Sequence, residues 1–322
     1  MNDKKNIAIG VLAYNEENFI EQVLVQLAEL NTSIYVINDK STDSTLKILN
    51  RISKEQKNIT VIENSKNFGA GYSTLKLLKR IKDDGYQYMI KVDGDGQFNF
   101  KDIKRIKEIL TSGKYDFIKC NRFWSNGIEG KIPHKRYFGN LLATMMLQFT
   151  AGTNRLYDPL NGLFAISVRF LNLINQNKYP MRYGYPFYFS AQSAISNFRI
   201  YQINNIISYN NQKSDLSSIK MLLTLTRLVF YFQKVKIRNK LYIGKHQRSA
   251  FLDILFNVFL IITTVVFFRF ILIFTPLQYF DTSYIGSWAL ILLVLGIFTI
   301  FIFIQSFKEE KEIRREYIKI DE

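Results

Sequence analysis

Short apolar runs alternate with amphipathic segments along the N-terminal part of the chain, and no other feature of the sequence constrains its fold so strongly. The apolar runs, at residues 7–12, 34–38, 59–63 and 86–92, have the length and composition of strands. The segments at 17–30, 43–53 and 70–83 carry apolar residues at helical spacing. This alternation is typical of a parallel sheet covered by helices, so we predict an α/β domain with a Rossmann-like, mostly parallel sheet.

Polar residues follow three of these runs directly. Asn15 and Glu16 follow the first run, Asp39 follows the second, and Asp93 and Asp95 follow the fourth. Ligands of open α/β sheets bind beyond the carboxyl ends of the strands. We therefore expect these side chains to meet at one edge of the sheet.

The segment Asp93-Gly94-Asp95 places two carboxylates on either side of a glycine. Such a pair can bind Mg²⁺ or Mn²⁺ through oxygen atoms and leave coordination positions for a substrate diphosphate. Gly94 and Gly96 allow a bulky ligand to lie close to the backbone. The pattern is weak when taken alone, because surface turns are rich in Asp and Gly. Its position after a predicted buried strand favours the metal-binding interpretation.

The sequence does not match two other phosphate-binding motifs. Residues 69–74 begin like a dinucleotide-binding fingerprint but lack its third glycine, and the loop G-x-x-x-x-G-K-[ST] does not occur in the sequence. The sequence therefore disfavours a nicotinamide-dependent dehydrogenase and a P-loop NTPase.

Four motifs taken together resemble a known family. They are Ala13-Tyr14-Asn15-Glu16, Asn38-Asp39-Lys40-Ser41-Thr42-Asp43-Ser44-Thr45, Asn67-Phe68-Gly69-Ala70-Gly71 and Asp93-Gly94-Asp95-Gly96-Gln97. Their order and spacing are similar to those of family 2 glycosyltransferases, and most of all to the dolichol-phosphate-mannose synthase branch. That branch includes bacterial enzymes that load sugars onto undecaprenyl phosphate. The resemblance covers roughly residues 5–215 and implies a GT-A-like catalytic domain.

The resemblance also implies roles for individual residues. Asp93 and Asp95 would hold Mg²⁺ or Mn²⁺ against the donor diphosphate. Arg122 and Arg136 would bind the acceptor-lipid phosphate and the donor diphosphate, a task that suits the planar guanidinium fork; surface arginines without a ligand are the alternative. The donor nucleotide would contact Ala13, Tyr14, Asn15, Glu16, Asp39, Asn67, Gly69, Asp93 and Gln97.

Asp158 corresponds to a further acidic position of the family. The resemblance makes it a candidate catalytic residue beside Asp95, Arg122 and Arg136. The alternative is a structural turn, because the Asp-Pro and Asn-Gly pairs within residues 158–162 are both strong turn signals.

Several positions depart from the family pattern. Asn38 and Lys40 replace the usual Asp and Gly of the second motif, so we expect Asp39 alone to make the base or ribose contact. Asn140 stands where the family usually has Ser, and its amide can still donate to a phosphate oxygen. An acceptor-loop arginine is missing from residues 208–217, which leaves Lys213 as the nearest cation for the acceptor phosphate.

The C-terminal third carries two long apolar runs. Residues 285–304 are uncharged and long enough to cross a membrane as a helix, whereas the run 251–268 is interrupted by Asp253 and Asn257. We predict a transmembrane hairpin within residues 249–306, with spans at about 251–274 and 285–305; a buried core helix is the alternative for the first run. The formal net charge of +16 indicates an anionic partner, and a membrane fits it.

Charge placement predicts the orientation of the hairpin. Lys and Arg residues precede the first run and follow the second, while the connection 275–284 has neither. Both flanks should therefore face the cytoplasm, and Arg269 would have to reach toward the outer surface or pair within the protein. We predict a two-span protein of the bacterial cytoplasmic membrane, with its catalytic domain and C-terminus in the cytoplasm. The N-terminus does not resemble a signal peptide, and the single Cys120 excludes an intramolecular disulfide.

These patterns divide the chain into four parts. Residues 1–217 form the predicted catalytic domain, 218–248 amphipathic helices on the membrane surface, 249–306 the hairpin and 307–322 a charged cytoplasmic tail. The alternative for 218–248 is a set of helices packed on the globular domain, since amphipathicity alone does not separate the two. The paired spans could also mediate assembly into a homo-oligomer.

The sequence predicts an inverting, metal-dependent transfer of a single hexose or related sugar from a nucleotide-diphosphate sugar to polyprenyl phosphate. A hydroxyl acceptor would need a general base beside the attacking oxygen, and residues 187–198 contain no carboxylate. The alternatives are a family 2 transferase with a different acceptor and a membrane scaffold that binds nucleotide sugars without turnover. Binding of nucleic acid has little beyond the basic charge in its favour, so we expect no nucleic-acid partner.

Overall fold

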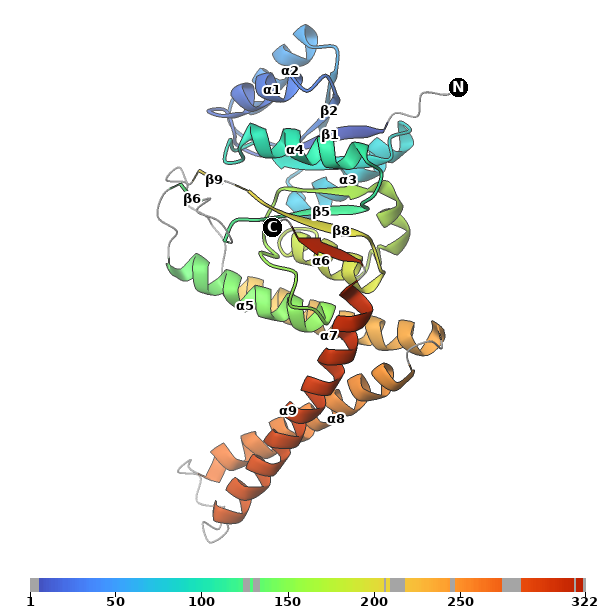
Figure 1. Ribbon diagram of the computed structural model, residues 1–322. Coiled ribbons are helices and arrows are strands. Elements are labelled where there is room, and N and C mark those ends of the chain that lie inside the picture. The colour runs from blue at the N-terminus through green and yellow to red at the C-terminus, as the bar shows by residue number, and fades with distance from the viewer. Residues whose placement is uncertain are drawn as a thin grey trace. The chain divides into compact units, whose positions relative to one another are not determined.

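The computed structural model describes residues 6–123, 128–129, 134–205, 207–208, 218–243, 247–273, 285–315 and 317–320 (Figure 1). The chain divides into two compact units. The first, which we call the sheet unit, comprises residues 1–232 and 316–322. The second, the helical unit, comprises residues 233–315.

The sheet unit is built on an eight-stranded sheet with the strand order β10-β8-β5-β7-β4-β1-β2-β3. Strand β7 runs antiparallel to both of its neighbours, and every other neighbouring pair in this sheet is parallel. The strands are β1 (Ile7–Ala13), β2 (Ser33–Asn38), β3 (Ile59–Glu63), β4 (Tyr88–Asp93), β5 (Phe117–Asn121), β7 (Phe164–Ser167), β8 (Ile200–Asn204) and β10 (Ile318–Ile320). A separate parallel pair joins β6 (Ile128–Glu129) to β9 (Ile207–Ser208).

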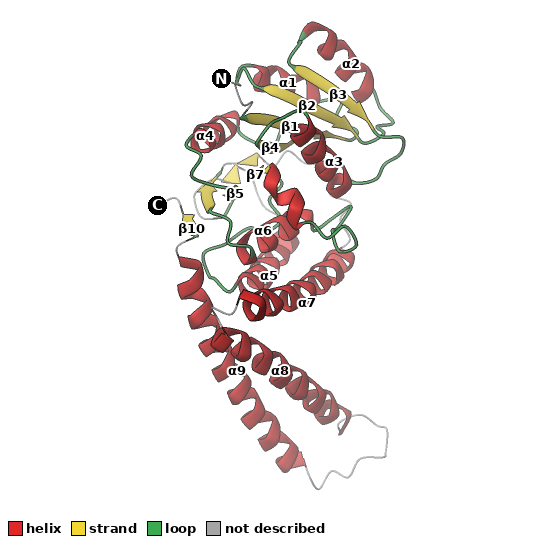
Figure 2. Cartoon of the chain, turned by 90° about the vertical axis from the view of Figure 1, so that its right-hand side faces the viewer, coloured by secondary structure: helices red, strands yellow, loops and turns green. Residues whose placement is uncertain are grey.

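Helices cover both faces of this sheet, and Figure 2 shows α3 and α4 on opposite sides of it. The helices of the sheet unit are α1 (Ile20–Ala28), α2 (Thr45–Glu55), α3 (Ala70–Asp83), α4 (Phe100–Thr111), α5 (His134–Ala151) and α6 (Tyr185–Ile195), with a 3₁₀ helix, η1 (Val168–Leu173). The first four strands and first three helices overlap the segments predicted from the alternation. The prediction of a mostly parallel α/β sheet is confirmed.

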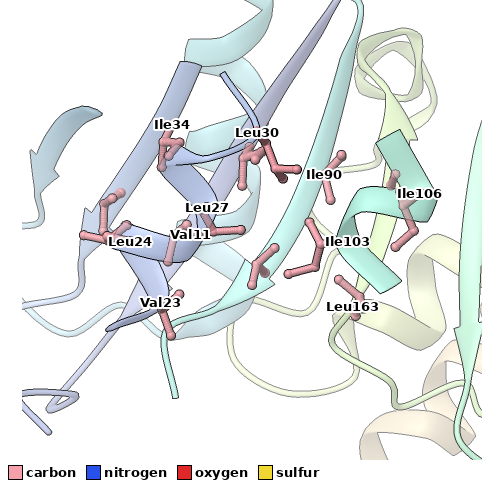
Figure 3. Close-up of a cluster of buried hydrophobic side chains, with 14 of the residues drawn as sticks. Val11, Val23, Leu24, Leu27, Leu30, Ile34, Ile90, Ile103, Ile106 and Leu163 are labelled. Atoms are coloured by element: carbon pink, nitrogen blue, oxygen red, sulfur yellow. The ribbon is translucent and has the colours of Figure 1, made fainter. Parts of the chain in front are cut away.

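The main core lies between the sheet and the helices α1, α2 and α4. Leu24 and Leu27 of α1 and Ile106 of α4 point onto Val11 and Ile90 of the neighbouring strands β1 and β4 (Figure 3). All seven residues of β1 are buried, as expected for a parallel strand that is covered on both faces.

The other face of β1 and β4 packs against α3. A Cβ atom added to Gly10 would lie 2.9 Å from the Met89 sulfur and 3.3 Å from Leu77 of α3. The close packing on both faces fixes the positions of the loops that follow β1, β2 and β4.

Three helices account for most of the rest of the chain. Helix α7 (Ser218–Ile243) begins in the sheet unit and ends in the helical unit, which also contains α8 (Gln247–Ile273) and α9 (Ile285–Arg315). Among the described residues, 247–271 and 286–314 form two helices that are long and apolar enough to cross a membrane. They pack against each other through a Thr263–Thr299 hydrogen bond of 2.9 Å and through Phe256 and Phe303, whose ring centroids lie 5.4 Å apart.

The segment predicted as a charged tail contains the end of a helix and a short strand. Helix α9 continues through Arg315, and residues 318–320 then form β10, which pairs with β8 of the sheet unit. The chain thus returns from the helical unit to the sheet unit. Residues 218–243 form one continuous helix, and the boundary between the units falls inside it.

Candidate functional site

The loops after β1, β2 and β4 lie beside one another at the carboxyl edge of the sheet. Ala13 pairs with Asn38, and Leu12 pairs with Asp93. Beyond these pairs, the Asp39 amide donates to the Ala13 carbonyl (2.9 Å) and the Gly94 amide donates to the Leu12 carbonyl (2.8 Å). The structure therefore brings the three predicted polar segments together.

The loop that carries Asn15 and Glu16 is tied to the segment after β2. Asn15 has a left-handed backbone (φ 58°), its amide donates to Ser41 Oγ (3.0 Å), and its Oδ1 accepts from the Thr42 amide (2.8 Å). The Glu16 amide donates to Thr45 Oγ1 (2.8 Å). Ala13 is buried and Tyr14 is 45% exposed, so from this loop Tyr14 can reach a ligand more readily.

Asp39 organises the loop that follows β3. Its Oδ1 accepts from Asn64 Nδ2 (2.7 Å) and the Phe68 amide (3.0 Å), and its Oδ2 accepts from the Gly69 amide (2.8 Å). A carboxylate offers about four acceptor positions, so these three bonds leave one for a ligand. Asn67 in the same loop is held by Arg182, whose Nη1 donates to Asn67 Oδ1 (3.2 Å) and whose Nη2 donates to the Asn67 carbonyl (3.1 Å).

Asp93 and Asp95 occupy different surroundings. The fully buried Lys91 donates from Nζ to Asp93 Oδ1. Asp95 Oδ1 accepts from the Gln97 amide (3.1 Å), which gives Gln97 a role in holding the carboxylate. Burial, together with the charge of Asp93, raises the pKa of Asp95 to about 6.

Glu16 is a third acidic side chain at this edge of the sheet. Burial and then the charges of Asp95 and Asp93 raise the pKa of Glu16 to about 8. The cluster has one buried cation, Lys91, for three acidic side chains, and hard oxygen donors of this kind fit a divalent cation. Among the described side chains, no group of three His, Cys, Asp or Glu residues lies at metal-binding distances.

Arg122 and Asp158 form an ion pair. Arg122 donates from Nε to Asp158 Oδ2 (2.7 Å) and from Nη2 to Oδ1 (2.6 Å), and its amide donates to Oδ2 (3.1 Å). Asp158 is fully buried and has a left-handed backbone (φ 50°). Burial opposes its ionisation, but the Arg122 charge and hydrogen bonds lower the pKa of Asp158 below its usual value. An ionised, fully bonded carboxylate is suited to orienting Arg122.

The remaining predicted acceptor residues are only partly covered by the structure. Arg136 lies in the first turn of α5, but its side chain falls outside the described residues, as does the whole of Lys213. Asn140, on the same helix, is buried, and its Oδ1 has no hydrogen-bond partner within the described part of the chain.

Sequence reasoning missed three residues that contact the predicted site residues. Lys91 is a single cation in an otherwise apolar run, which is a signal that could have been noticed. Arg182 meets Asn67 across 115 positions of sequence, and Gly162 lies against Asp93. Nothing local in the sequence identifies either contact.

Comparisons with known proteins agree on one family. The model described as Glycosyl transferase family 2 matches residues 8–171, about half of the chain. An uncharacterized protein of Methanocaldococcus jannaschii is 27% identical over 227 residues, which are 68% of this chain and 96% of that protein. The UDP-N-acetylglucosamine–dolichyl-phosphate N-acetylglucosaminyltransferase of Methanococcus voltae is 26% identical over 192 residues, which are 56% of this chain and 76% of that protein.

A solved structure gives the same fold. Glucosyl-3-phosphoglycerate synthase from Mycobacterium tuberculosis, in complex with Mn²⁺, UDP and glucosyl-3-phosphoglycerate, superposes with a TM-score of 0.50. The match covers 72% of this chain and 80% of that chain at 17% identity. An identity this low shows the likeness of the fold alone.

Proposed function

The chain belongs to glycosyl transferase family 2, and from this premise we propose that it transfers one sugar from a nucleotide-diphosphate sugar to polyprenyl phosphate. The expectation of a GT-A-like, mostly parallel sheet with two apolar C-terminal helices is confirmed. The observation that carries the proposal is the meeting of Glu16, Asp93 and Asp95 at the carboxyl edge of this sheet.

The donor would bind at this edge. Asp95, with Asp93 beside it, would hold Mg²⁺ or Mn²⁺ against the diphosphate, and Gln97 would keep Asp95 in place. The metal would neutralise negative charge on the leaving nucleotide diphosphate. The solved structure of the same fold contains Mn²⁺ and UDP, which supports a divalent metal and a nucleotide as ligands. The nucleoside would contact the loop 13–16 and the segment that Asp39 organises, including Asn67 and Gly69.

The acceptor would be a phosphate rather than a hydroxyl. Helix α6 contains no carboxylate and is buried along its whole length, so it offers no general base. A phosphate monoester has a second pKa near 6 and is already mostly dianionic at neutral pH, so it needs orientation more than deprotonation. Arg122, oriented by Asp158, would supply this orientation with Arg136, Asn140 and Lys213. The relative from Methanococcus voltae, whose name specifies a dolichyl-phosphate acceptor, supports this choice.

A direct attack of the phosphate oxygen on the anomeric carbon would form the new glycosyl bond as the bond to the nucleotide diphosphate breaks. A single displacement of this kind inverts the anomeric configuration. No proton needs to leave the attacking phosphate at neutral pH.

The acceptor lipid would be reached at a membrane surface. Helices α8 and α9 would be the two spans, with the sheet unit and the C-terminus on the cytoplasmic side of a bacterial membrane. Exposed apolar side chains of the sheet unit gather on α5 and on the start of α7, which Figures 1 and 2 place beside each other. They are Tyr137, Phe138, Leu141, Leu142 and Met145 on α5, and Ile219, Leu222 and Leu223 on α7. Exposed apolar faces of this kind fit a lipid surface.

The test is a transfer assay with the full-length protein in detergent. The protein would be incubated with undecaprenyl phosphate and a panel of UDP- and GDP-sugars, with Mg²⁺, with Mn²⁺ or with chelator, and sugar would be measured in the lipid fraction. Metal-dependent product with one donor is the expected result. Transfer to a hydroxyl acceptor instead, or bound nucleotide without transfer to any acceptor, would contradict the proposal.

A further inference from the structure

Two buried lysines lie beneath the site, one on each side of β7. Lys91 of β4 and Lys119 of β5 both pair with Phe164 of β7. Directly opposed residues of antiparallel strands project from the same face of the sheet, so both lysines share the face of Phe164. Tyr185 and Phe189 of α6 pack on the Phe164 ring, with centroid distances of 6.4 and 5.0 Å. Both ammonium groups are therefore enclosed near an aromatic layer.

Each lysine bonds to a different half of the site. Lys91 is 0% exposed, donates to Asp93 Oδ1, and lies 5.4 Å from the centroid of the Tyr185 ring. Lys119 is 2% exposed and donates to the backbone carbonyl of Asp158 at 2.6 Å. Burying a charge is costly unless it is paired. Lys91 is paired with the donor carboxylate Asp93 itself, and Lys119 is bonded to Asp158, which holds Arg122.

One short turn, Asp158 to Gly162, connects these two halves. At its first residue, the Asp158 carboxylate bonds to Arg122. At its last residue, a Cβ atom added to Gly162 would lie 2.3 Å from Asp93 Oδ2 and 3.2 Å from Lys91 Nζ. Only glycine allows the Asp93 carboxylate to rest against the backbone here.

The turn is also held internally. Asn161 Nδ2 donates to Asp158 Oδ2 (3.1 Å), and Asn161 Oδ1 accepts from the Leu163 amide (3.0 Å). A second bond from Asn161 Nδ2 reaches Asn205 Oδ1 at 3.0 Å. These hydrogen bonds should therefore transmit a displacement of Gly162 to Asp158.

We propose that the turn 158–162, anchored by Lys91 and Lys119, is a positioning element that fixes the donor carboxylate Asp93 relative to the acceptor-side Arg122. The assignment of donor and acceptor sides rests on the proposed function. None of these groups needs to touch the reacting atoms. They hold the groups that do.

The first test is Gly162→Ala, with Gly296→Ala as the matched control because a Cβ at Gly296 would meet open space. Affinity for UDP in the presence of Mn²⁺ would be measured by calorimetry, and the KM for undecaprenyl phosphate by transfer. Loss of a supporting contact at a metal site typically costs about 10–100-fold in affinity. We expect Gly162→Ala to weaken UDP binding by about that factor and also to raise the acceptor KM, whereas Gly296→Ala changes neither.

Two lysine variants separate the halves. Lys91→Met should weaken Mn²⁺-dependent UDP binding with a smaller change in acceptor KM. Lys119→Met should raise the acceptor KM with a smaller change in UDP binding. If Gly162→Ala weakens UDP binding but leaves the acceptor KM at the wild-type value, the turn does not connect the two sides. If it changes neither, the turn does not position Asp93.

A measurement on the wild-type protein avoids the risk that these variants fold poorly. The Arg122 amide donates to Asp158 Oδ2 at 3.1 Å, so its hydrogen exchange reports on the acceptor end of the turn. Addition of Mn²⁺ and UDP should slow this exchange, and an unchanged rate despite bound UDP would overturn the proposal. These binding and exchange readouts need no transfer, so they stand even if polyprenyl phosphate proves not to be the acceptor.

Discussion

Replacement of Arg122 by Met should destabilise the protein strongly, because it leaves a buried charge behind. Asp158 is 0% exposed, and Arg122, itself only 16% exposed, gives it two side-chain hydrogen bonds of 2.7 and 2.6 Å. Removing one partner of a buried ion pair costs about 3–5 kcal/mol. For a domain of roughly 150–250 residues, each kcal/mol lowers the melting temperature by about 2–4 °C, so we expect a decrease of about 6–20 °C.

The pH dependence of this decrease follows from the pKa of Asp158. In the wild type the folded-state pKa is lowered, so the stabilisation is present above the unfolded pKa of about 3.9 and is lost as pH falls through the folded value. Without Arg122, burial remains and should raise the folded pKa above the unfolded one. The resulting penalty is then largest at neutral pH and disappears as Asp158 becomes protonated on acidification.

Thermal unfolding of the full-length protein in detergent, measured between pH 4 and pH 7, tests both statements. The difference between wild type and Arg122→Met should be largest at pH 7 and should shrink toward pH 4. The double variant Arg122→Met with Asp158→Asn should recover much of the lost stability, because no buried carboxylate remains and Asn tolerates the left-handed backbone at this position. A melting temperature within about 2 °C of wild type at pH 7, less than the shift expected for one kcal/mol, would refute the reasoning and favour Arg122 as a ligand-binding side chain without a structural role.

Three further substitutions have defined expectations. Asp95→Asn should lower metal-dependent transfer by about a hundredfold or more, since a metal ligand contributes several kcal/mol to the transition state. Circular dichroism should show an intact fold, and a normal transfer rate would show that Asp95 is not a metal ligand. Gly71→Ala would place a Cβ 2.1 Å from the Pro180 carbonyl oxygen, and overpacking against backbone should cost about 1–3 kcal/mol in thermal unfolding. Asp253→Leu removes a carboxylate that pairs with two buried lysines, Lys236 and Lys240, and should cost about 3–5 kcal/mol. The control Glu309→Gln, whose partner Arg248 is 84% exposed, should cost about 0–1 kcal/mol; equal melting temperatures for the two variants would contradict this.

Local patterns in the sequence were sufficient for the first half of the sheet. The predicted run 7–12 became β1 (Ile7–Ala13), and the predicted helix 70–83 became α3 (Ala70–Asp83). These elements are specified by apolar spacing within a few residues, so their positions can be read without knowing what they contact. The polar residues after each strand then follow from the direction of the parallel strands.

The later strands could not be located in this way. Strand β7 has only four residues and enters the sheet antiparallel between β4 and β5, and β10 has three residues in a charged segment. Such short strands carry almost no periodic signal. They become strands because of distant partners, β8 in the case of β10.

The same limit applies to the roles of Arg122 and Asp158. The sequence alone predicts Arg122 as a phosphate ligand and Asp158 as either a catalytic carboxylate or part of a turn. They lie 36 positions apart, and their direct pairing shows that Asp158 holds Arg122 in one orientation. The pairing also explains why a left-handed Asp is kept at 158, since its carboxylate reaches both the Arg122 side chain and the Arg122 amide.

Asp253 illustrates how a residue that weakens a sequence prediction can be explained by tertiary contacts. An acid within an apolar run is costly in a membrane unless it is paired. In the helical unit Asp253 is 3% exposed, and its Oδ2 accepts from Lys240 Nζ at 2.6 Å. Its Oδ1 accepts from Ser306 Oγ of α9 at 2.5 Å.

Lys240 links this pair to helix α9, because it also forms an ion pair with Glu310, which in turn pairs with Arg314 at 2.7 Å. Lys240 and Arg314 are thus buried partners as well as members of the basic flanks that predict the orientation of the hairpin. The last turns of α7 are consequently bound to both apolar helices by charge pairs. These pairs involve the buried side of the last turns, whereas Leu241 and Tyr242 there are exposed, as are Ile219, Leu222 and Leu223 in the first turns. Exposed apolar side chains at both ends of α7 are therefore compatible with the surface role that we propose for this helix.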